Sequence, residues 1–196
     1  MKVCVITGQG SCKCKNVKGK IIVDPVDYRL AMRFVFSDHS WYTNMVILES
    51  LPVLQPNAEF AVKRVLMNPV QIKQLLLPLV GAIIADNFES AVSGHLKLAN
   101  AALEPLRNDD KVALAEAVNN FYAQGNDFGA AIYSLNPKMI TLEAADAMVR
   151  EHNEFVVKLA TLRKQQNYEE YITTTDMYNK HMMMVADLIC ELIKSR

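Results

Sequence analysis

Residues 141–196 read TLEAADAMVREHNEFVVKLATLRKQQNYEEYITTTDMYNKHMMMVADLICELIKSR. Apolar side chains recur every three or four residues on both sides of the polar break Gln165-Gln166-Asn167, which places them on one helical face. The first face consists of Ala145, Met148, Val149, His152, Phe155, Val156, Leu159 and Leu162, and the second of Tyr171, Ile172, Thr175, Tyr178, Met182, Val185, Ile189, Leu192 and Ile193. The pattern predicts two helices that close on each other as an antiparallel hairpin, with a histidine inside the apolar stripe of the first.

An earlier helix is predicted to begin at Asp24-Pro25, because aspartate caps a helix and proline suits its first position. Its predicted buried face contains Tyr28, Met32, Val35, His39, Tyr42, Val46 and Glu49, and is broadened by Phe34, Trp41, Met45 and Leu48. Further helices are predicted over residues 57–66, 72–80, 86–106 and 111–133, with caps at Asn57, Asp86 and Asp110 and with His95 in an apolar stripe. Thr141 and Asn167 are predicted to cap the two helices of the hairpin. The sequence therefore predicts an all-α fold, an antiparallel bundle of about six helices over residues 25–196.

Residues 1–24 differ from the rest of the chain and are predicted to form a separate arm. The β-branched runs 3–6 and 20–23 are separated by three glycines, which is typical of a short β-hairpin or an extended arm. Cys12-Lys13-Cys14, with Cys4, resembles part of a thiolate zinc site, but the usual two-residue spacer and a nearby fourth ligand are missing. Four cysteines without a secretion signal indicate a reducing compartment.

Length and charge exclude several classes of protein. A chain of 196 residues that is 51% hydrophobic suits one domain with a substantial core. The 21 basic and 21 acidic residues cancel, so we expect neither a nucleic acid nor a membrane surface as partner. The longest apolar stretch, residues 75–85, is too short to span a bilayer. These features predict a cytoplasmic protein.

The sequence also hints at an internal duplication. Asn68-Pro69 and Asn136-Pro137 each stand ahead of a helix that carries a histidine in its stripe. The intervals between the matching residues are unequal, so chance similarity is an equally good explanation of the pattern. If the repeat is real, it predicts two helical hairpins related by a pseudo-two-fold axis.

Several short motifs, in order, are similar to those of a known family. They are Asp38-His39-Ser40-Trp41-Tyr42-Thr43, Val65-Leu66-Met67-Asn68-Pro69, Gly94-His95-Leu96, Phe121-Tyr122 followed by Asn126-Asp127, Ser134-Leu135-Asn136-Pro137, Glu151-His152, and Asp176 with Met184-Val185-Ala186-Asp187. Over residues 34–193 the chain resembles a family of uncharacterised all-helical proteins of bacilli and large DNA viruses. The resemblance implies a helical domain inside a cell, or in an infected host cell or virion, and no particular activity. The chain departs from the family pattern at Asn44, at Gln124-Gly125-Asn126-Asp127 and in its last three residues.

Two functional readings follow from the histidines in the apolar stripes. His39, His95 and His152, with Asp127 or Asp187, suit a transition-metal site for iron, zinc or manganese inside a helical bundle. The same histidines can instead be core residues that hydrogen-bond tyrosines or backbone carbonyls. A small-ligand site would use Tyr42, Tyr122 and Asn126. No Glu-x-x-His pair of the ferritin-like kind is present.

A catalytic function has weaker support than an interaction function. Ser93, Ser134 and Cys190 lack an activating motif, Cys190 reads as a small buried hydrophobe, and no glycine-rich phosphate loop follows a strand. A short hairpin is marginal in water and needs something to pack on. Together with ten methionines and zero net charge, this hairpin favours a structural or interaction module that forms a homo-oligomer or binds a protein partner.

Overall fold

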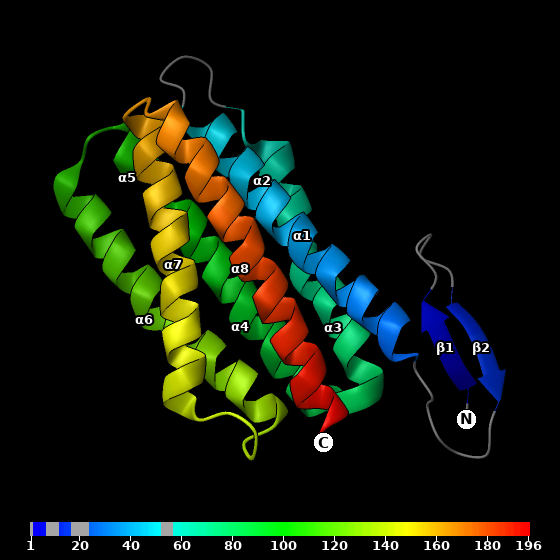
Figure 1. The fold of residues 1–196 in the computed structure, drawn as a ribbon. Helices are drawn as coiled ribbons and strands as arrows, with labels where there is room; N and C mark the ends of the chain where they lie inside the picture. The colour runs from blue at the N-terminus through cyan, green and yellow to red at the C-terminus, as the bar shows by residue number, and fades with distance from the viewer. Residues whose placement is uncertain (1, 7–11, 17–23, 52–56) are drawn as a thin grey trace.

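The computed structural model describes residues 2–6, 12–16, 24–51 and 57–196. Within these ranges the helices are α1 (Pro25–Ser50), α2 (Glu59–Val65), α3 (Asn68–Val80), α4 (Ala82–Ala101), α5 (Leu103–Arg107), α6 (Lys111–Leu135), α7 (Leu142–Lys164) and α8 (Tyr168–Lys194). Six of them are long and pack as a bundle, whereas α2 and α5 are short connecting helices (Figure 1). The predicted all-α bundle is confirmed.

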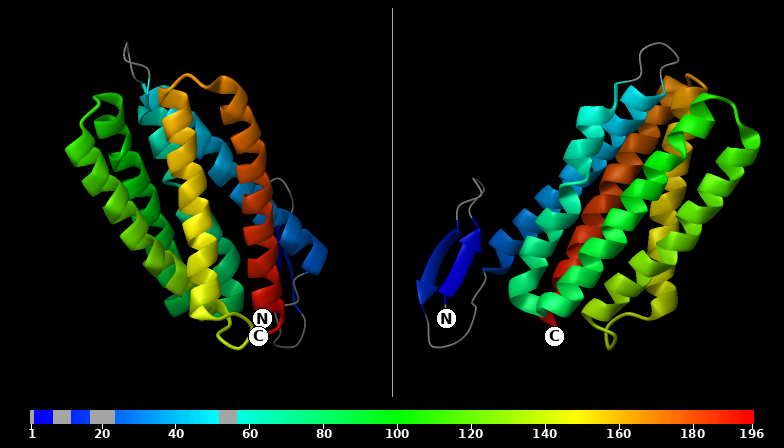
Figure 2. Two further views of the ribbon diagram at one scale, coloured as in Figure 1. Left: turned by 60° about the vertical axis from the view of Figure 1, so that its left-hand side comes forward. Right: turned by 180° about the vertical axis from the view of Figure 1, so that it is seen from behind.

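The six long helices form a closed ring in which neighbours run in opposite directions (Figures 1 and 2). Going round the ring, α1 contacts α3, α3 contacts α4, α4 contacts α6, α6 contacts α7, α7 contacts α8, and α8 returns to α1. The predicted antiparallel hairpin is the α7–α8 pair. Since every long helix has a neighbour on both sides, the apolar stripes meet in one central core, whose largest fully buried side chains include Phe36, Phe88, Phe121, Ile132, Leu159 and Tyr178.

Four predicted helix starts are capped by the side chains that the sequence indicated. Asp24 Oδ1 accepts from Val26 N at 2.8 Å, and the carboxylate of Asp110 caps α6 in the same way. Thr141 and Asn167 cap α7 and α8. Each such cap contributes about 1 kcal/mol, because it satisfies a backbone N–H that has no partner inside the helix.

Two other predicted helix starts are wrong. α4 begins at Ala82, directly after Gly81, whose φ of +84° is one that glycine adopts readily. The Asp86 carboxylate, predicted to be a cap, instead pairs with Lys73 Nζ at 2.8 Å. Asn57 does not cap α2, since the N-cap residue there is Ala58. Gly81 divides the apolar run 75–85 between α3 and α4, and no helix in the described residues is long and apolar enough to cross a membrane.

One face of α1 differs from the prediction. Phe34, Trp41 and Leu48 were expected to broaden the buried face, yet they are 66%, 65% and 39% exposed. Apolar residues lie on several sides of this helix. Its partners α2, α3, α7 and α8 cover the side that carries Met32, Phe36, His39 and Ile47 and leave Phe34, Trp41 and Leu48 outside. Three large apolar side chains are therefore left on the outer side of α1.

The amino-terminal arm contains two described strands, β1 (Lys2–Ile6) and β2 (Cys12–Asn16). They pair antiparallel, with Cys4 opposite Cys14. The predicted first strand falls in β1, but its partner is β2 and not the run 20–23, which lies outside the described residues. A zinc site on Cys4, Cys12 and Cys14 rests on side chains that also lie outside the described part of the chain. Cys190 is buried, as predicted.

Helices α6 and α7 approach each other closely at two glycines. A Cβ atom at Gly129 would lie 1.9 Å from Asp146 Oδ1 and 3.0 Å from Asp146 Cα, and one at Gly125 would lie 2.7 Å from Asn153 Nδ2. α6 passes through both positions without a break. The glycines therefore lower the helix propensity of α6, but because they have no side chain they allow α6 and α7 to lie close together. This contact holds α7, with His152, against the core.

Candidate metal centre

Three histidines from three helices meet in the core. His39 comes from α1, His95 from α4 and His152 from α7, and their exposed fractions are 2%, 1% and 3%. One ring nitrogen of each lies within 4.8 Å of the other two. The helical periodicity placed each histidine in an apolar stripe, and the closed ring of helices brings the three stripes to one point. Imidazole is a common ligand for transition metals, so the cluster can hold a metal ion.

The histidine nitrogens are arranged as one close pair and one separate ring. His95 Nε2 and His152 Nε2 are 2.9 Å apart, a hydrogen-bond distance at which one ring donates and the other accepts. The His39 ring centroid lies 5.7 Å from that of His152 and 6.5 Å from that of His95. In a tetrahedral zinc site with bonds of about 2.0–2.1 Å, ligand nitrogens stand about 3.3 Å apart. Binding a metal therefore requires the close pair to open slightly and His39 to move inward.

The orientation of His39 is fixed by a buried asparagine. His39 Nδ1 lies 2.9 Å from Asn68 Oδ1, while Asn68 Nδ2 donates to the Val35 carbonyl oxygen at 2.7 Å. Since the amide oxygen can only accept, we assign the proton to His39 Nδ1. That leaves His39 Nε2 with a free lone pair, the form in which a histidine binds metal. Asn68 is the first residue of α3, so the Asn-Pro helix start also positions a candidate ligand.

Burial keeps the cluster neutral. It lowers the pKa of His39 to about 4 and that of His95 to about 3, because the charged imidazolium loses its solvation. The pKa of His152 lies well below its usual value for the same reason, with the neighbouring histidines adding to the effect. At neutral pH the three rings are therefore uncharged, as metal binding needs. The ring that donates in the His95–His152 hydrogen bond must move its proton from Nε2 to Nδ1 before that Nε2 can bind a metal.

The surroundings of the cluster are apolar. The His95 ring centroid lies 4.7 Å from that of Phe121 and 5.5 Å from that of Phe128, and the ring of Tyr178 lies 5.4 Å from His152. A cavity of about 10 Å³ borders His39 and His152, which is about the space that one water molecule needs. Three nitrogens and a small adjoining space match a metal site that keeps one coordination position open.

Two polar atoms in this region have no protein partner. His95 Nδ1 and the Tyr178 hydroxyl are buried without a hydrogen bond. Native proteins leave few such atoms, and their presence marks a site at which another species is needed or strain is stored. A metal on His95 Nε2 would leave Nδ1 as it is, so this atom does not by itself indicate a metal. The fit of a metal ion rests on the three neutral imidazoles, whose ligand nitrogens lie within 4.8 Å of one another.

A fourth buried histidine, His181 of α8, was missed by the sequence analysis. It is 2% exposed, and its ring lies 6.1 Å from that of His152. His181 Nδ1 is 3.4 Å from the Glu151 carboxylate, yet neither ring nitrogen has a hydrogen bond of good geometry, so we regard this as a contact only. Burial lowers the pKa of His181, and Glu151 opposes the shift. Its position three residues after Tyr178, on the same helical face, was the available signal.

The two predicted aspartate ligands lie elsewhere. Asp127 is exposed on α6. Asp187 accepts from Arg33 Nε at 2.8 Å, and this hydrogen bond lowers the pKa of the Asp187 carboxyl. Among the described residues, the group that can hold a metal consists of the three histidines without either aspartate. A carboxylate is more stable beside an arginine at the surface than inside an apolar core.

The predicted ligand-binding residues do not join the cluster either. Tyr42 is half-buried under the Arg64 guanidinium, whose central carbon lies 4.2 Å from the ring centroid. Tyr122 is half-buried on α6, where burial raises its pKa, and Asn126 is exposed. In the described part of the chain, no hydrogen bond joins any of the three to the histidines. Asn44 accepts a hydrogen bond from the Tyr171 hydroxyl at 2.8 Å.

The residues themselves are the basis for assigning a function. The geometry of the histidine cluster, its neutrality and its small adjoining cavity all concern one site. Comparison of this chain with protein-family models, with curated proteins and with solved structures finds no match.

Proposed function

We propose that this protein binds one divalent transition-metal ion at His39, His95 and His152. The observation that carries the proposal is that three neutral, buried imidazoles from three helices bring a ligand nitrogen each within 4.8 Å of the others. A set of three nitrogens without a carboxylate favours zinc over manganese, which prefers oxygen ligands. Iron, the other metal expected from the sequence, is an alternative occupant of the same ligands.

The protein's part in this function is to hold the ligands and exclude water. Asn68 keeps the His39 proton on Nδ1, and the aromatic rings of Phe121 and Phe128 keep the site dry. A metal bound by three nitrogens would supply a Lewis acid with an open position. The adjoining cavity is too small for a substrate larger than water. The site therefore supports metal binding, and no reaction is assigned to it.

The first test is a zinc titration of the metal-free full chain, with elemental analysis of the protein as purified. We expect one metal per chain. We expect His95→Gln to weaken zinc binding more than about 100-fold and Asn68→Ala by about 10- to 100-fold, since partners that orient ligands have effects of that size. Circular dichroism checks that each variant is folded.

His181→Gln is the matched control, because it removes a buried histidine of the same core that is not one of the three ligands. Its zinc affinity should stay near that of the original chain. If the original chain binds no transition metal, or if His95→Gln binds as tightly as His181→Gln, the cluster is a hydrogen-bonded part of the core and the proposal is wrong.

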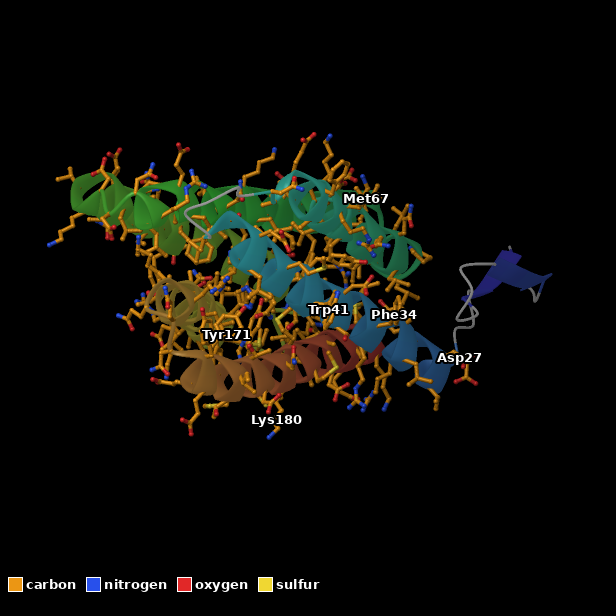
Figure 3. The ribbon with its side chains drawn as sticks, turned by 90° about the horizontal axis from the view of Figure 1, so that it is seen from above. Asp27, Phe34, Trp41, Met67, Tyr171 and Lys180 are labelled. Atoms are coloured by element: carbon orange, nitrogen blue, oxygen red, sulfur yellow. The ribbon has the colours of Figure 1, made fainter. Side chains whose placement is uncertain are left out.

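A second function, self-association, is favoured by the outer face of α1. Phe34, Trp41 and Leu48 are exposed and seven residues apart, the spacing of a helix–helix seam. Figure 3 shows Phe34 and Trp41 along α1. Exposed aromatic residues in line are typical of protein interfaces. We propose that two copies of the chain pack through this face.

Charges beside the seam are already neutralised within one chain. Arg33 pairs with Asp187, and Arg64 with Asp38. Packing a second copy against Phe34, Trp41 and Leu48 therefore does not bury an unpaired charge of Arg33 or Arg64. The proposed contact then depends mainly on these three apolar side chains. This proposed contact uses the outer face of α1, whereas the sequence analysis expected self-association through the amino-terminal arm or the methionines. Of these methionines, Met182 is buried, while Met177 and Met184 are exposed.

Trp41→Glu should convert a dimer into a monomer. Loss of a central interface tryptophan typically costs about 2 kcal/mol or more, which weakens association more than about 30-fold. Sedimentation equilibrium over a range of concentrations measures the change. Val112→Glu, an equally drastic change at an exposed position of α6, is the control and should leave the dimer intact. A monomer at all concentrations, or a Trp41→Glu variant that still dimerises normally, contradicts this proposal.

The family resemblance and the cytoplasmic location remain predictions. The motifs Asp38-His39 and Gly94-His95 that carry the resemblance contain two of the three proposed ligands. Metal binding by relatives in bacilli and large DNA viruses would extend the proposal to them.

A further inference from the structure

A second cavity lies apart from the histidine cluster, between α1, α2, α4, α5 and α7. Its volume is about 120 Å³, and none of the four histidines lines it. It is found where α1 and α4 approach their last turns, at the upper end of the bundle in Figure 1. The walls are formed by Val46, Ile47, Val62, Val65, Leu66, Leu96, Ala99, Leu103 and Val156, and the polar lining residues are Thr43, Lys97 and Asn100.

The inner end of this cavity is apolar. Ile47, Leu96, Leu103 and Val156 are between 2% and 6% exposed, yet space remains between them. Protein interiors usually leave few voids larger than a water molecule. A volume of 120 Å³ is about ten times the space of roughly 10–15 Å³ that one water molecule needs, and apolar walls give water few partners. An aliphatic chain of four or five carbons therefore fits the space better than water does.

The outer end of the cavity carries one cation. Lys97 and Asn100 are exposed residues of α4, three positions apart, so both lie at the same edge of the cavity. Among the residues that the structure describes, no acidic side chain lines the cavity and Lys97 has no ion pair. The carboxyl end of α4 adds a partial negative charge of about one half, which is smaller than the full charge of the ammonium. The edge therefore attracts an anion.

We propose that this cavity binds a short aliphatic monocarboxylate of five or six carbons. The chain occupies the apolar interior, and the carboxylate accepts hydrogen bonds from the Lys97 ammonium and the Asn100 amide. The site is independent of the proposed metal centre, because the two share no residue. Its test is made on metal-free protein, so its failure leaves the metal proposal unaffected.

The experiment is a titration of the full chain with sodium hexanoate, followed by NMR of the side-chain methyl groups. We expect saturable binding at one site, with shifts confined to methyl groups of the cavity walls. Sodium acetate, which lacks the chain, should not saturate. Lys97→Met should weaken hexanoate about fivefold, as expected for one exposed ion pair, and should leave the weaker binding of 1-hexanol unchanged.

A space-filling variant tests the location. Ala99→Leu should abolish binding of both hexanoate and 1-hexanol and should raise the thermal midpoint, because the added side chain fills the cavity. Ala123→Leu, at an exposed position of α6, is the matched control and should bind hexanoate normally. Absence of saturable binding, equal affinity for hexanoate and 1-hexanol, or unchanged binding by Ala99→Leu would each overturn the proposal.

Discussion

Acidification from pH 7 to pH 4 should unfold the metal-free chain. Above the usual pKa of histidine, near 6.5, the buried histidines are neutral in both the folded and the unfolded states. Below it the unfolded chain takes up protons, while folded His39 and His95 do so only near pH 4 and pH 3. The free energy of unfolding therefore falls as the pH falls, by about 1.4 kcal/mol per pH unit for each such histidine.

The sum over the buried histidines is comparable with the whole stability of a domain, about 5–15 kcal/mol. Urea unfolding followed by circular dichroism, in a chelator and at pH values from 7.5 to 4, measures the dependence. His181→Leu removes one buried histidine whose nitrogens have no hydrogen bond, so its curve should be less steep. A free energy of unfolding that does not change between pH 7 and pH 5 would show that the cluster is not buried and neutral.

Gly129→Ala should lower the free energy of unfolding by about 2 kcal/mol. The new Cβ atom would lie 1.9 Å from Asp146 Oδ1 and 3.0 Å from Asp146 Cα, so both the side chain and the backbone of α7 would have to move. Overpacking of this kind costs about 1–3 kcal/mol or more, and the gain of about 1 kcal/mol in helix propensity offsets only part of it. Urea unfolding at pH 7 measures the difference.

Gly94→Ala is the control for this prediction. Its Cβ atom would lie 3.0 Å from Gln124 Nε2, at the end of a flexible side chain. The gain in helix propensity should then roughly balance the contact, with a change within about 1 kcal/mol. If Gly129→Ala proves as stable as Gly94→Ala, then α6 and α7 are not in close contact at this position.

The parts of the fold that depend on local chemistry could be predicted from the sequence. A cap such as Asp24 or Thr141 bonds a backbone N–H two or three residues away, so the pattern and its partner are adjacent in the chain. The start of α4 could not be predicted, because the acidic pair at Asp86 and Glu89 fits a helix cap as well as it fits an ion pair with Lys73. Only the packing of α3 against α4 decides between the two.

The candidate metal centre was predictable to a similar extent. His39, His95 and His152 lie in apolar stripes, and a stripe identifies a buried residue without naming its neighbours. The bond from His39 to Asn68 joins residues 29 positions apart and depends on how α1 meets α3. Asp187 lies apart from the cluster because it pairs with Arg33, 154 positions away in the chain, which no local pattern indicates. The exposure of Trp41 could not be predicted either, since α1 is apolar on several sides.

The three proposed ligands stand at positions 39, 95 and 152, so the order of synthesis decides when a complete metal site can form. A ribosome must have made most of the polypeptide before the last imidazole emerges, so a nascent chain that stops earlier offers at most two of them. Binding of a metal ion to all three histidines would then occur only after α7 has been synthesised and the helices have assembled.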